Sequence, residues 1–392
     1  MNASTFDVVV AGAGLVGAGC ALALGRRGVR TALIAADAAV PYAASADDWD
    51  PRIYALSPAS VRFLDAIGVW SRLDAGRVAT CSQMEIFGDR DHARLTFDAY
   101  EAGTTALAHM LESRAIAAAI DAALQAVHCV SIIPNDRVVG LMRDAGGATV
   151  ALGSGQTLRC SLLVGADGAG SGVRELVGMQ AKRHDYTSAA VVANFYTSHP
   201  HGGCAFQWFT GDSVLALLPL AGNRISMVWS LPELAARRLL ALPEAALVEE
   251  IRTVSGGRMG ELAVITAARS FPLTRLRVAD PVAERVVLIG DAAHVVHPLA
   301  GQGVNLGFGD AEALAEVIAK RGSIVDPGAM PLLRRYRRIR AEPILAMLAI
   351  THGLHGLFAL PGDLPRFIRN TGLNLLQRVP VVRSMLARQA MG

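Results

Sequence analysis

Short apolar runs alternate with glycine-rich turns at the start of the chain. Residues 6–11 form the first run, glycines punctuate residues 12–17, helix-forming residues extend over 15–27, and residues 30–35 form a second run. Short β-rich runs bounded by turn residues predict strands, whereas the longer stretch predicts a helix. Strand, turn, helix and strand within about thirty residues predict a βαβ unit of a parallel sheet.

Two later apolar runs end in a carboxylate beside a glycine. Residues 161–166 lead into Asp167, and residues 285–289 lead into Gly290 and Asp291. Because open parallel sheets bind ligands at the carboxyl ends of their strands, both aspartates are candidates for a ligand site. Each motif alone is more often an ordinary turn that ends a strand than a ligand site.

Three apolar runs between these segments predict a second sheet. They cover residues 189–195, 214–220 and 224–231, with turns at Gly211 and Gly222. Closely spaced strands joined by short turns pair antiparallel. We therefore expect an α/β fold, in which a Rossmann-like dinucleotide-binding domain carries an inserted, mostly antiparallel-sheet substrate domain and a C-terminal helical segment.

The expected domains are discontinuous along the chain. The dinucleotide-binding domain comprises residues 1–75, 101–178 and 268–345, the substrate domain residues 76–100 and 179–267, and the C-terminal helical segment residues 346–392.

Composition excludes a disordered chain and points to a cytoplasmic enzyme. The 392 residues are 52% hydrophobic, enough for two interlocked cores. Five cysteines show no paired spacing for a zinc or dithiol site, which suits a reducing compartment. The apolar stretch over residues 8–24 lacks the preceding basic residues of an export signal.

His294 and His297 lack the adjacent glutamate of a zinc protease helix, so we expect hydrogen-bonding or packing roles and no metal.

Positive charge gathers at the C-terminal end. Residues 331–392 carry ten arginines against Glu342 and Asp363, so this part holds +8 although the whole chain carries only +3. Residues 343–360 contain too many polar residues and glycines for a membrane span. Beyond them, arginines alternate with apolar residues, which predicts either a peripheral contact on the inner face of the membrane or an ordinary solvated helix face. No nucleic-acid partner is expected.

Gly12, Gly14 and Gly17 form a GxGxxG motif directly after a strand and at the start of a helix. This context predicts a phosphate group held by backbone N–H groups at the positive end of the helix dipole. The acidic residue expected to bind ribose is missing, because Ala35 stands at its place. Either Asp37 reaches the ribose from a shifted turn, or water and backbone groups replace it.

Three motifs occur in one order: GxGxxG, GADGxxSxVR over residues 165–174, and GDAAHxxxPxxGQGxN over residues 290–305. Together they resemble the flavin monooxygenases typified by para-hydroxybenzoate hydroxylase. Within that group, residues 50–57 resemble the DxRxxALS segment of the ubiquinone-biosynthesis hydroxylases, and residues 297–307 and 390–392 are similar to the same family. The resemblance spans essentially the whole chain.

The resemblance implies an FAD cofactor. Gly12, Gly14 and Gly17 would cradle its pyrophosphate, and Arg52 would neutralise part of the charge. Asp291 would bind the ribityl chain, and residues 301–303 would present N–H groups to the flavin at a helix N-terminus. The other residues implied for the cofactor site are Asp167, Gly168, Gly290, Gly301, Gln302, Gly303 and Asn305. Ser113 departs from the asparagine that often follows the family's glutamate, so Glu112 and Arg114 receive no role.

The resemblance also implies an activity. NAD(P)H or another electron donor would reduce the FAD, O2 would add at the flavin C4a carbon, and one oxygen atom would pass to a polyprenylated phenol or benzoquinol of ubiquinone biosynthesis. The flavin would carry the chemistry, so no catalytic side chain is assigned. A ubiquinone-biosynthesis complex is a further expected partner. The alternatives are a hydroxylase of a small soluble aromatic, an FAD-dependent isoprenoid reductase, and a non-catalytic FAD-binding redox sensor.

Overall fold

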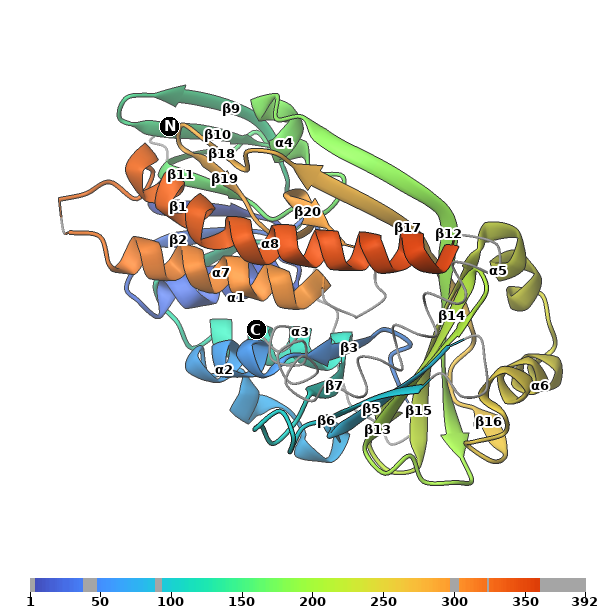
Figure 1. The fold of residues 1–392 in the computed structure, drawn as a ribbon. Helices are drawn as coiled ribbons and strands as arrows, with labels where there is room; N and C mark the ends of the chain where they lie inside the picture. The colour runs from blue at the N-terminus through green and yellow to red at the C-terminus, as the bar shows by residue number, and fades with distance from the viewer. Residues whose placement is uncertain (1–3, 38–47, 89–93, 297–302, 323, 360–392) are drawn as a thin grey trace.

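A parallel sheet forms around the first strand, as the opening pattern predicts. The computed structural model describes residues 4–37, 48–88, 94–296, 303–322 and 324–359. In it β1 (Ser4–Ala11) lies between β2 (Thr31–Ile34) and β11 (Thr157–Gly165), with β8 (Val130–Ile133) and β19 (Val286–Leu288) further out. The remaining strands of this sheet are β9 (Val138–Asp144), β10 (Gly147–Leu152) and β18 (Val282–Ala283). Since α1 (Leu15–Gly25) connects β1 to β2, the predicted βαβ unit is confirmed (Figure 1).

Two element boundaries differ from the sequence-based ones for physical reasons. The first helix ends at Gly25, before the predicted residue 27, and the turn after it needs Gly28 at φ +77°. β11 begins at Thr157, ahead of the predicted residue 161, because its first residues pair antiparallel with β10. Tertiary pairing thus decides where the apolar run becomes a strand.

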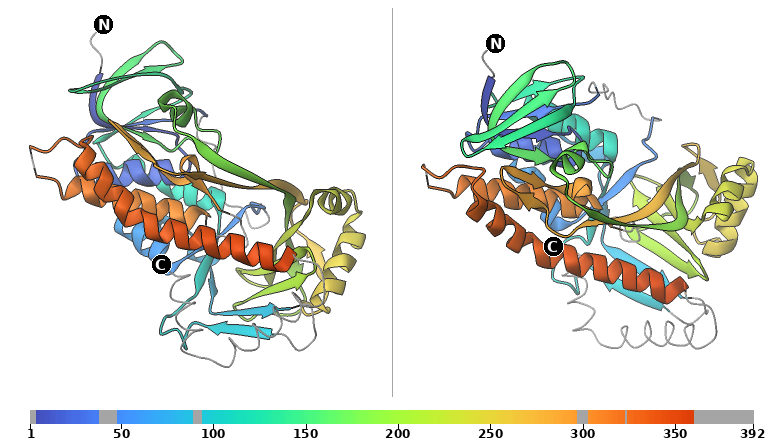
Figure 2. Two further views of the ribbon diagram at one scale, coloured as in Figure 1. Left: turned by 45° about the horizontal axis from the view of Figure 1, so that its top comes forward. Right: turned by 90° about the horizontal axis from the view of Figure 1, so that it is seen from above.

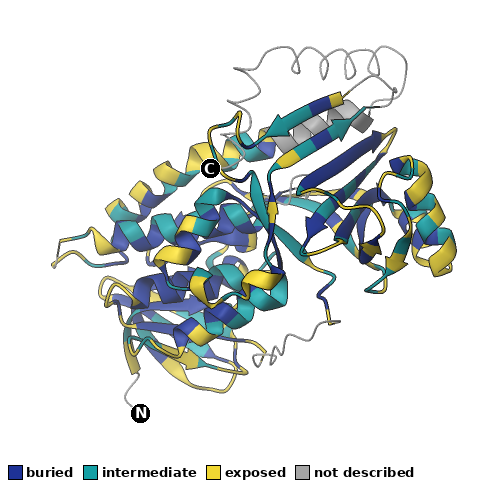
Figure 3. Cartoon of the chain, turned by 90° about the horizontal axis from the view of Figure 1, so that it is seen from below, coloured by how far each residue is buried: buried dark blue, intermediate teal, exposed yellow. Residues whose placement is uncertain are grey.

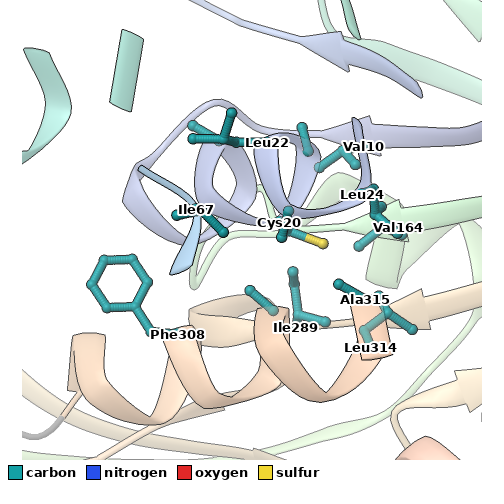
Figure 4. Packing of buried hydrophobic residues seen from close by; sticks show 14 of the residues in the cluster. Val10, Cys20, Leu22, Leu24, Ile67, Val164, Ile289, Phe308, Leu314 and Ala315 are labelled. Atoms are coloured by element: carbon teal, nitrogen blue, oxygen red, sulfur yellow. The ribbon is translucent and has the colours of Figure 1, made fainter. Parts of the chain in front are cut away.

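Helices pack closely against one face of this sheet. α1 contacts α7 (Gly303–Ala319), and Figure 4 shows Cys20 of α1 pointing into the apolar layer that includes Ile289 and Ala315. Burial raises the pKa of the Cys20 thiol to about 12, so this cysteine stays protonated and packs as an apolar residue. The described cysteines are all free.

The second sheet is mostly antiparallel, which confirms the predicted architecture. Its strand order is β20-β17-β12-β15-β14-β13-β5-β6, with β16 beside β12, and only β13 and β5 pair in parallel. Gly211 (φ +63°) and Gly222 (φ +71°) make the two predicted turns. The strands are β5 (Gln83–Phe87), β6 (Arg94–Asp98), β12 (Ala181–Thr197), β13 (Cys204–Thr210), β14 (Ser213–Leu220), β15 (Arg224–Pro232), β16 (Leu262–Val264), β17 (Arg269–Val278) and β20 (His294–Val295).

β12 and β17 are long strands that reach from the second sheet to the first. The pattern predicts only residues 189–195 for β12, yet the strand starts at Ala181, where it pairs with Val278 of β17. Residues 182–185, near the start of this strand, are exposed and polar or charged. The apolar pattern therefore does not extend over them. An irregularity between Asp185 and Ala189 separates the two halves of the pairing. The strand pair joins the two sheets (Figures 1 and 2).

The remaining elements are a small third sheet and the helices that cover the two large sheets. β7 pairs with β3 and β4 in a separate small sheet, and the outer face of the second sheet is covered by α5 and α6, whose exposed sides are seen in Figure 3. The elements are β3 (Ile53–Leu56), β4 (Ala79–Cys81), β7 (Ala108–Glu112), α2 (Pro58–Ala66), α3 (Ser113–Leu124), α4 (Gly172–Val177), α5 (Glu233–Leu240) and α6 (Glu244–Ser255), with short 3-10 turns η1 (Trp70–Arg72), η2 (Ala75–Arg77) and η3 (Gly290–Ala292).

The last described helix, α8 (Met330–Ala359), packs along α7 and continues through Pro343 (Figure 2). The expected boundary between residues 345 and 346 therefore falls inside a helix, and β17, placed by the prediction in the dinucleotide-binding domain, pairs with β12 of the second sheet. The domain boundaries themselves stay a prediction. Within the described residues, no helix is long and apolar enough to cross a membrane.

Candidate functional site

A cavity of about 790 Å³ lies between the parallel sheet and the second sheet. Its walls come from the β1–α1 turn, the segment before β3, the turn after β19, the start of α7 and one face of the second sheet. Segments that are far apart in the sequence therefore meet at one site. Of the predicted cofactor residues, the cavity is lined by Gly14, Gly17, Arg52, Gly168, Gly290, Asp291 and Gly303.

The three glycines of the first motif have three different surroundings. A Cβ on Gly12, whose φ is +105°, would lie 2.4 Å from the Ala166 carbonyl oxygen. A Cβ on Gly17 would lie 2.0 Å from the Gly12 carbonyl oxygen. Among the described residues, apart from the neighbours of Gly14 in the chain and the backbone of its own helix, no atom lies within 4 Å of the Cβ position of Gly14. The first and third glycines thus permit close packing, whereas Gly14 leaves room at the N-terminus of α1 for a phosphate to approach the backbone.

Asp291 faces the cavity from the turn after β19. Its side chain is exposed to the cavity, and desolvation by the surrounding protein raises its pKa, against the opposing effects of His294 and Arg52. Gly290 makes the turn at φ +57° and packs on Val16 of α1. A carboxylate held here can accept hydrogen bonds from sugar hydroxyls, so its position suits the predicted ribityl contact.

A buried charge network supports that turn from behind. Asp310 of α7 is fully buried and accepts hydrogen bonds from the Gly290 amide (2.9 Å), His294 Nε2 (2.6 Å) and Arg340 Nε of α8 (2.7 Å). Desolvation raises the pKa of Asp310, but the interactions with His294, Arg340 and the Gly290 amide outweigh it, and the net direction is down. Sequence reasoning missed Asp310. The feature of the sequence that could have revealed it is a carboxylate among the apolar positions of a predicted helix.

His294 has the hydrogen-bonding role that the sequence predicts, since it is buried and bonded to Asp310. His297 lies outside the described residues. Among the described residues, no group of three or more His, Cys, Asp or Glu side chains is placed to hold a metal ion.

Arg52 projects into the cavity from a segment that is fastened at several points. Its guanidinium carbon lies 4.7 Å from the centre of the Phe271 ring of β17. Its backbone amide donates to Asp50, and the Asp50 amide donates in turn to Glu112 (2.7 Å). Glu112 is buried and paired with Arg77 (2.6 Å). Glu112, to which the sequence assigned no role, is thus the anchor of the segment that presents Arg52.

Asp167 and Asn305 direct their side chains toward the protein. Asp167 accepts hydrogen bonds from Ser171 Oγ and the Val173 amide at the start of α4, while its neighbour Gly168 lines the cavity. Asn305 donates to the Ala55 carbonyl and accepts from Ser57 and Ser60, which ties α7 to the chain after β3. Their predicted contacts with the cofactor stay predictions.

The other predicted cofactor residues are placed as follows. Asp37 is exposed beyond β2 and is not among the residues that line the cavity, so its ribose contact stays a prediction. Gly303 begins α7 at the cavity. Gly301 and Gln302 lie outside the described residues.

One face of the second sheet forms the opposite wall of the cavity. Along β14, Val214, Ala216 and Leu218 line the cavity, whereas Leu215 and Leu217 point to the other side and pack in the core beneath α5 and α6. This alternation follows from the two-residue period of a strand. The side chains of this wall are mostly apolar and small, so the wall suits a flat apolar ligand. No motif in the sequence marked it.

The glycine turn, the strand-ending aspartate and the apolar cavity together are typical of a dinucleotide-binding protein with a second, apolar ligand site. A family model described as an FAD binding domain matches residues 5–349. Ubiquinone hydroxylase UbiL of Rhodospirillum rubrum is 34% identical over 387 residues, 98% of this chain and 89% of that protein. The 3-demethoxyubiquinol 3-hydroxylase of Escherichia coli is 33% identical over 390 residues, 98% of both chains. The crystal structure of p-nitrophenol 4-monooxygenase PnpA from Pseudomonas putida has a TM-score of 0.78 at 21% identity and covers 99% of both chains.

The chain therefore belongs to the FAD binding domain family, and it is an FAD-dependent monooxygenase related to the ubiquinone-biosynthesis hydroxylases. The resemblance seen in the motifs is confirmed. The space at Gly14 and the carboxylate of Asp291 fit the pyrophosphate and the sugar-like chain of FAD.

Proposed function

We propose that this enzyme inserts one oxygen atom from O2 into the ring of a polyprenylated phenol or benzoquinol in ubiquinone biosynthesis. The observation that carries the proposal is the cavity of about 790 Å³, which joins the FAD motifs to an apolar sheet face. Relatives named as ubiquinone hydroxylases match almost the whole chain, which supports the same substrate class.

FAD, when bound, supplies the electron transfer and the activation of O2. The protein binds and orients the reactants. The α1 N-terminus at Gly14 and the Arg52 guanidinium favour the negative pyrophosphate, and Asp291 accepts hydrogen bonds from the ribityl hydroxyls. Apolar side chains of the second sheet exclude water from the reacting ring, which protects activated oxygen from wasteful release as peroxide.

The reductant in this proposal is NAD(P)H or another electron donor. GxGxxG occurs once in the chain in the strand–turn–helix context, and its cavity position suits FAD. A nicotinamide would then bind transiently, and stopped-flow reduction of the bound flavin by NADH, NADPH and a reduced ferredoxin would identify the donor.

A peripheral membrane contact is part of the proposal, because a polyprenylated ring resides in a bilayer. On α8, the apolar residues Ile339 and Leu345 are exposed beside a run of arginines. Arg366, Arg369 and Arg378 of the predicted amphipathic segment lie outside the described residues. Replacing these three arginines with glutamine should lower binding to anionic vesicles strongly at low salt and weakly at high salt, without loss of FAD. Unchanged vesicle binding would remove the membrane contact from the proposal.

Deletion of the gene in its host tests the substrate. We expect loss of ubiquinone and accumulation of a prenylated precursor that lacks one ring hydroxyl, with recovery on return of the wild-type gene. Normal ubiquinone levels in the deletion strain, together with accumulation of a small soluble aromatic, would assign the enzyme to the other substrate class.

A further inference from the structure

The cavity face of the second sheet carries very few polar side chains. Strand register places Gln207 of β13 opposite Ala216, Ala216 opposite Val228, and Val228 opposite Val192, and all four residues line the cavity. Residues in such a row point to the same side of a sheet. Gln207 is the polar residue among these four cavity-lining residues.

Gln207 is only 4% exposed, and the described residues make no hydrogen bond to its side chain. Its amide atoms are not among the fully buried atoms that lack a partner, so they are open to the cavity that the residue lines. A buried amide without a partner is costly, and native proteins normally satisfy such groups with protein, water or ligand. Since the side chain lines the cavity, a group that occupies the cavity can form a hydrogen bond with the amide and would otherwise leave it desolvated.

The residues around Gln207 restrict what that partner can be. Ala205 and Ala216 leave space beside the amide, whereas Met84, Phe97 and Leu218 make the rest of that end of the cavity apolar. Among the described residues that line this end, none has a charged side chain. A neutral group that donates or accepts a hydrogen bond, attached to an apolar body, is the matching chemistry.

Ser230 is a second cavity polar group, but it lies elsewhere on the sheet. It is opposite Ala190 of β12, and Ala190 is opposite Phe271, over which Arg52 lies. Ser230 is therefore on the side of Arg52 and the cofactor motifs. Gln207 is two strands further along the sheet, beside β5.

We propose that the Gln207 side-chain amide binds an oxygen substituent of the substrate's aromatic ring and determines which ring the cavity accepts. This inference rests on the proposed function. A site with a buried hydrogen-bonding group selects against a ring that lacks the matching oxygen, because binding would then leave the amide unpaired. The flanking apolar row packs against the rest of the ring and the start of its prenyl chain.

The test compares two ligands on the FAD-loaded enzyme: a phenol with a short prenyl chain, and the same prenylbenzene without the hydroxyl group. Dissociation constants are measured from the change in flavin absorbance. Wild-type enzyme should prefer the phenol by about tenfold, and Gln207→Met, which keeps the length of the side chain but loses the amide, should reduce this preference to near unity. Gln207→Glu retains an acceptor and should keep part of the preference.

Val192→Ala is the matched control, because it changes the same row without touching a polar group. It should alter the affinity for both ligands by a similar factor and leave their ratio unchanged. If Gln207→Met does not retain FAD, Gln207→Leu provides the same comparison.

The outcomes distinguish failure of the Gln207 inference from failure of the proposed function. If wild type prefers the phenol and the Met or Leu variant keeps that preference, the role of Gln207 is wrong while the proposed function stands. If wild-type enzyme binds FAD but does not distinguish the two ligands, the proposed substrate class fails together with the inference.

Discussion

The two walls of the cavity are built in different ways. The wall that we propose for the cofactor, called the cofactor wall, uses backbone turns, glycines and a few polar groups such as Arg52 and Asp291. The wall that we propose for the substrate, called the substrate wall, uses every second side chain of consecutive strands in the second sheet. The first arrangement demands particular residues at particular spacings. The second demands only apolar residues of suitable size. Substitutions there can alter which ligand fits while the alternation of apolar and polar positions along the strands stays the same.

The two walls also differ in what stabilises them. The turn at Gly290 and Asp291 rests on the buried network of Asp310, His294 and Arg340. The substrate wall rests on the apolar cluster beneath α5 and α6. Damage to the cofactor wall should therefore cost stability or FAD, and damage to the substrate wall should alter ligand binding alone.

The largest effect is expected for Asp310→Ala. The substitution leaves His294 and Arg340 buried without their carboxylate, which should lower the free energy of unfolding by about 3–5 kcal/mol. Urea unfolding of the FAD-free protein measures this loss. Glu316→Gln, on the same helix but in an exposed pair with Lys320, is the control and should cost less than about 1 kcal/mol. Equal effects of the two substitutions would show that the network does not support the turn.

The same variant has a predicted pH dependence. Because the pKa of Asp310 is lowered in the folded protein, its stabilising contribution is present above the unfolded value of about 4 and is lost as pH falls through the folded pKa. The stability difference between wild type and Asp310→Ala should therefore shrink on acidification below about pH 4. A difference that grows on acidification would contradict the direction of the shift.

Asp291→Asn should separate cofactor affinity from stability. Loss of the charged acceptor should weaken FAD binding by about 1.5–3 kcal/mol, measured by titration of the apoprotein with FAD. Desolvation raises the pKa of Asp291, so its charged form is disfavoured in the folded apoprotein, and the neutral amide should raise the thermal midpoint of the apoprotein at pH 7. Unchanged FAD affinity would remove Asp291 from the cofactor site.

Alanine substitutions at Gly17 and Gly14 separate the effects of packing and of FAD binding within the cofactor wall. Gly17→Ala places a methyl group against the Gly12 carbonyl and should destabilise the apoprotein by about 1–3 kcal/mol. Among the described residues, Gly14→Ala meets no atom apart from its chain neighbours and the backbone of its own helix, so it should leave apoprotein stability within about 0.5 kcal/mol while weakening FAD binding. Thermal unfolding and FAD titration of both variants test this division. A Gly14→Ala variant that binds FAD normally would place the pyrophosphate elsewhere.

The smallest effect on the protein itself is expected for Ala216→Leu on the substrate wall. The larger side chain extends into the cavity, so it should lower kcat/KM for a prenylated phenol by about tenfold while FAD affinity and thermal stability stay near wild type. Activity on a prenylated phenol, with FAD content as the internal control, measures this. A parallel loss of FAD would show that the two walls are not independent.

The difference between the walls explains what the sequence could predict. GxGxxG and the strand-ending Asp291 require special backbone geometry, so spacing alone located them, and the family resemblance identified the cofactor. Asp310 and Glu112 act through partners that are distant along the chain, and a single sequence does not show such pairs. Gln207 sits in an alternating strand, where the pattern shows which residues share a face but not which face meets the cavity.

The central claim is that the cofactor wall and the substrate wall serve one oxygen insertion. The most direct measurement supplies isotope-labelled O2 to the FAD-loaded enzyme with a reductant and a short-chain prenylated phenol, and analyses the product by mass spectrometry. We expect one labelled oxygen atom on the ring, and less labelled product from Ala216→Leu at equal FAD content. A product whose new oxygen is unlabelled, or reoxidation of the flavin with an unchanged ring, would contradict the claim.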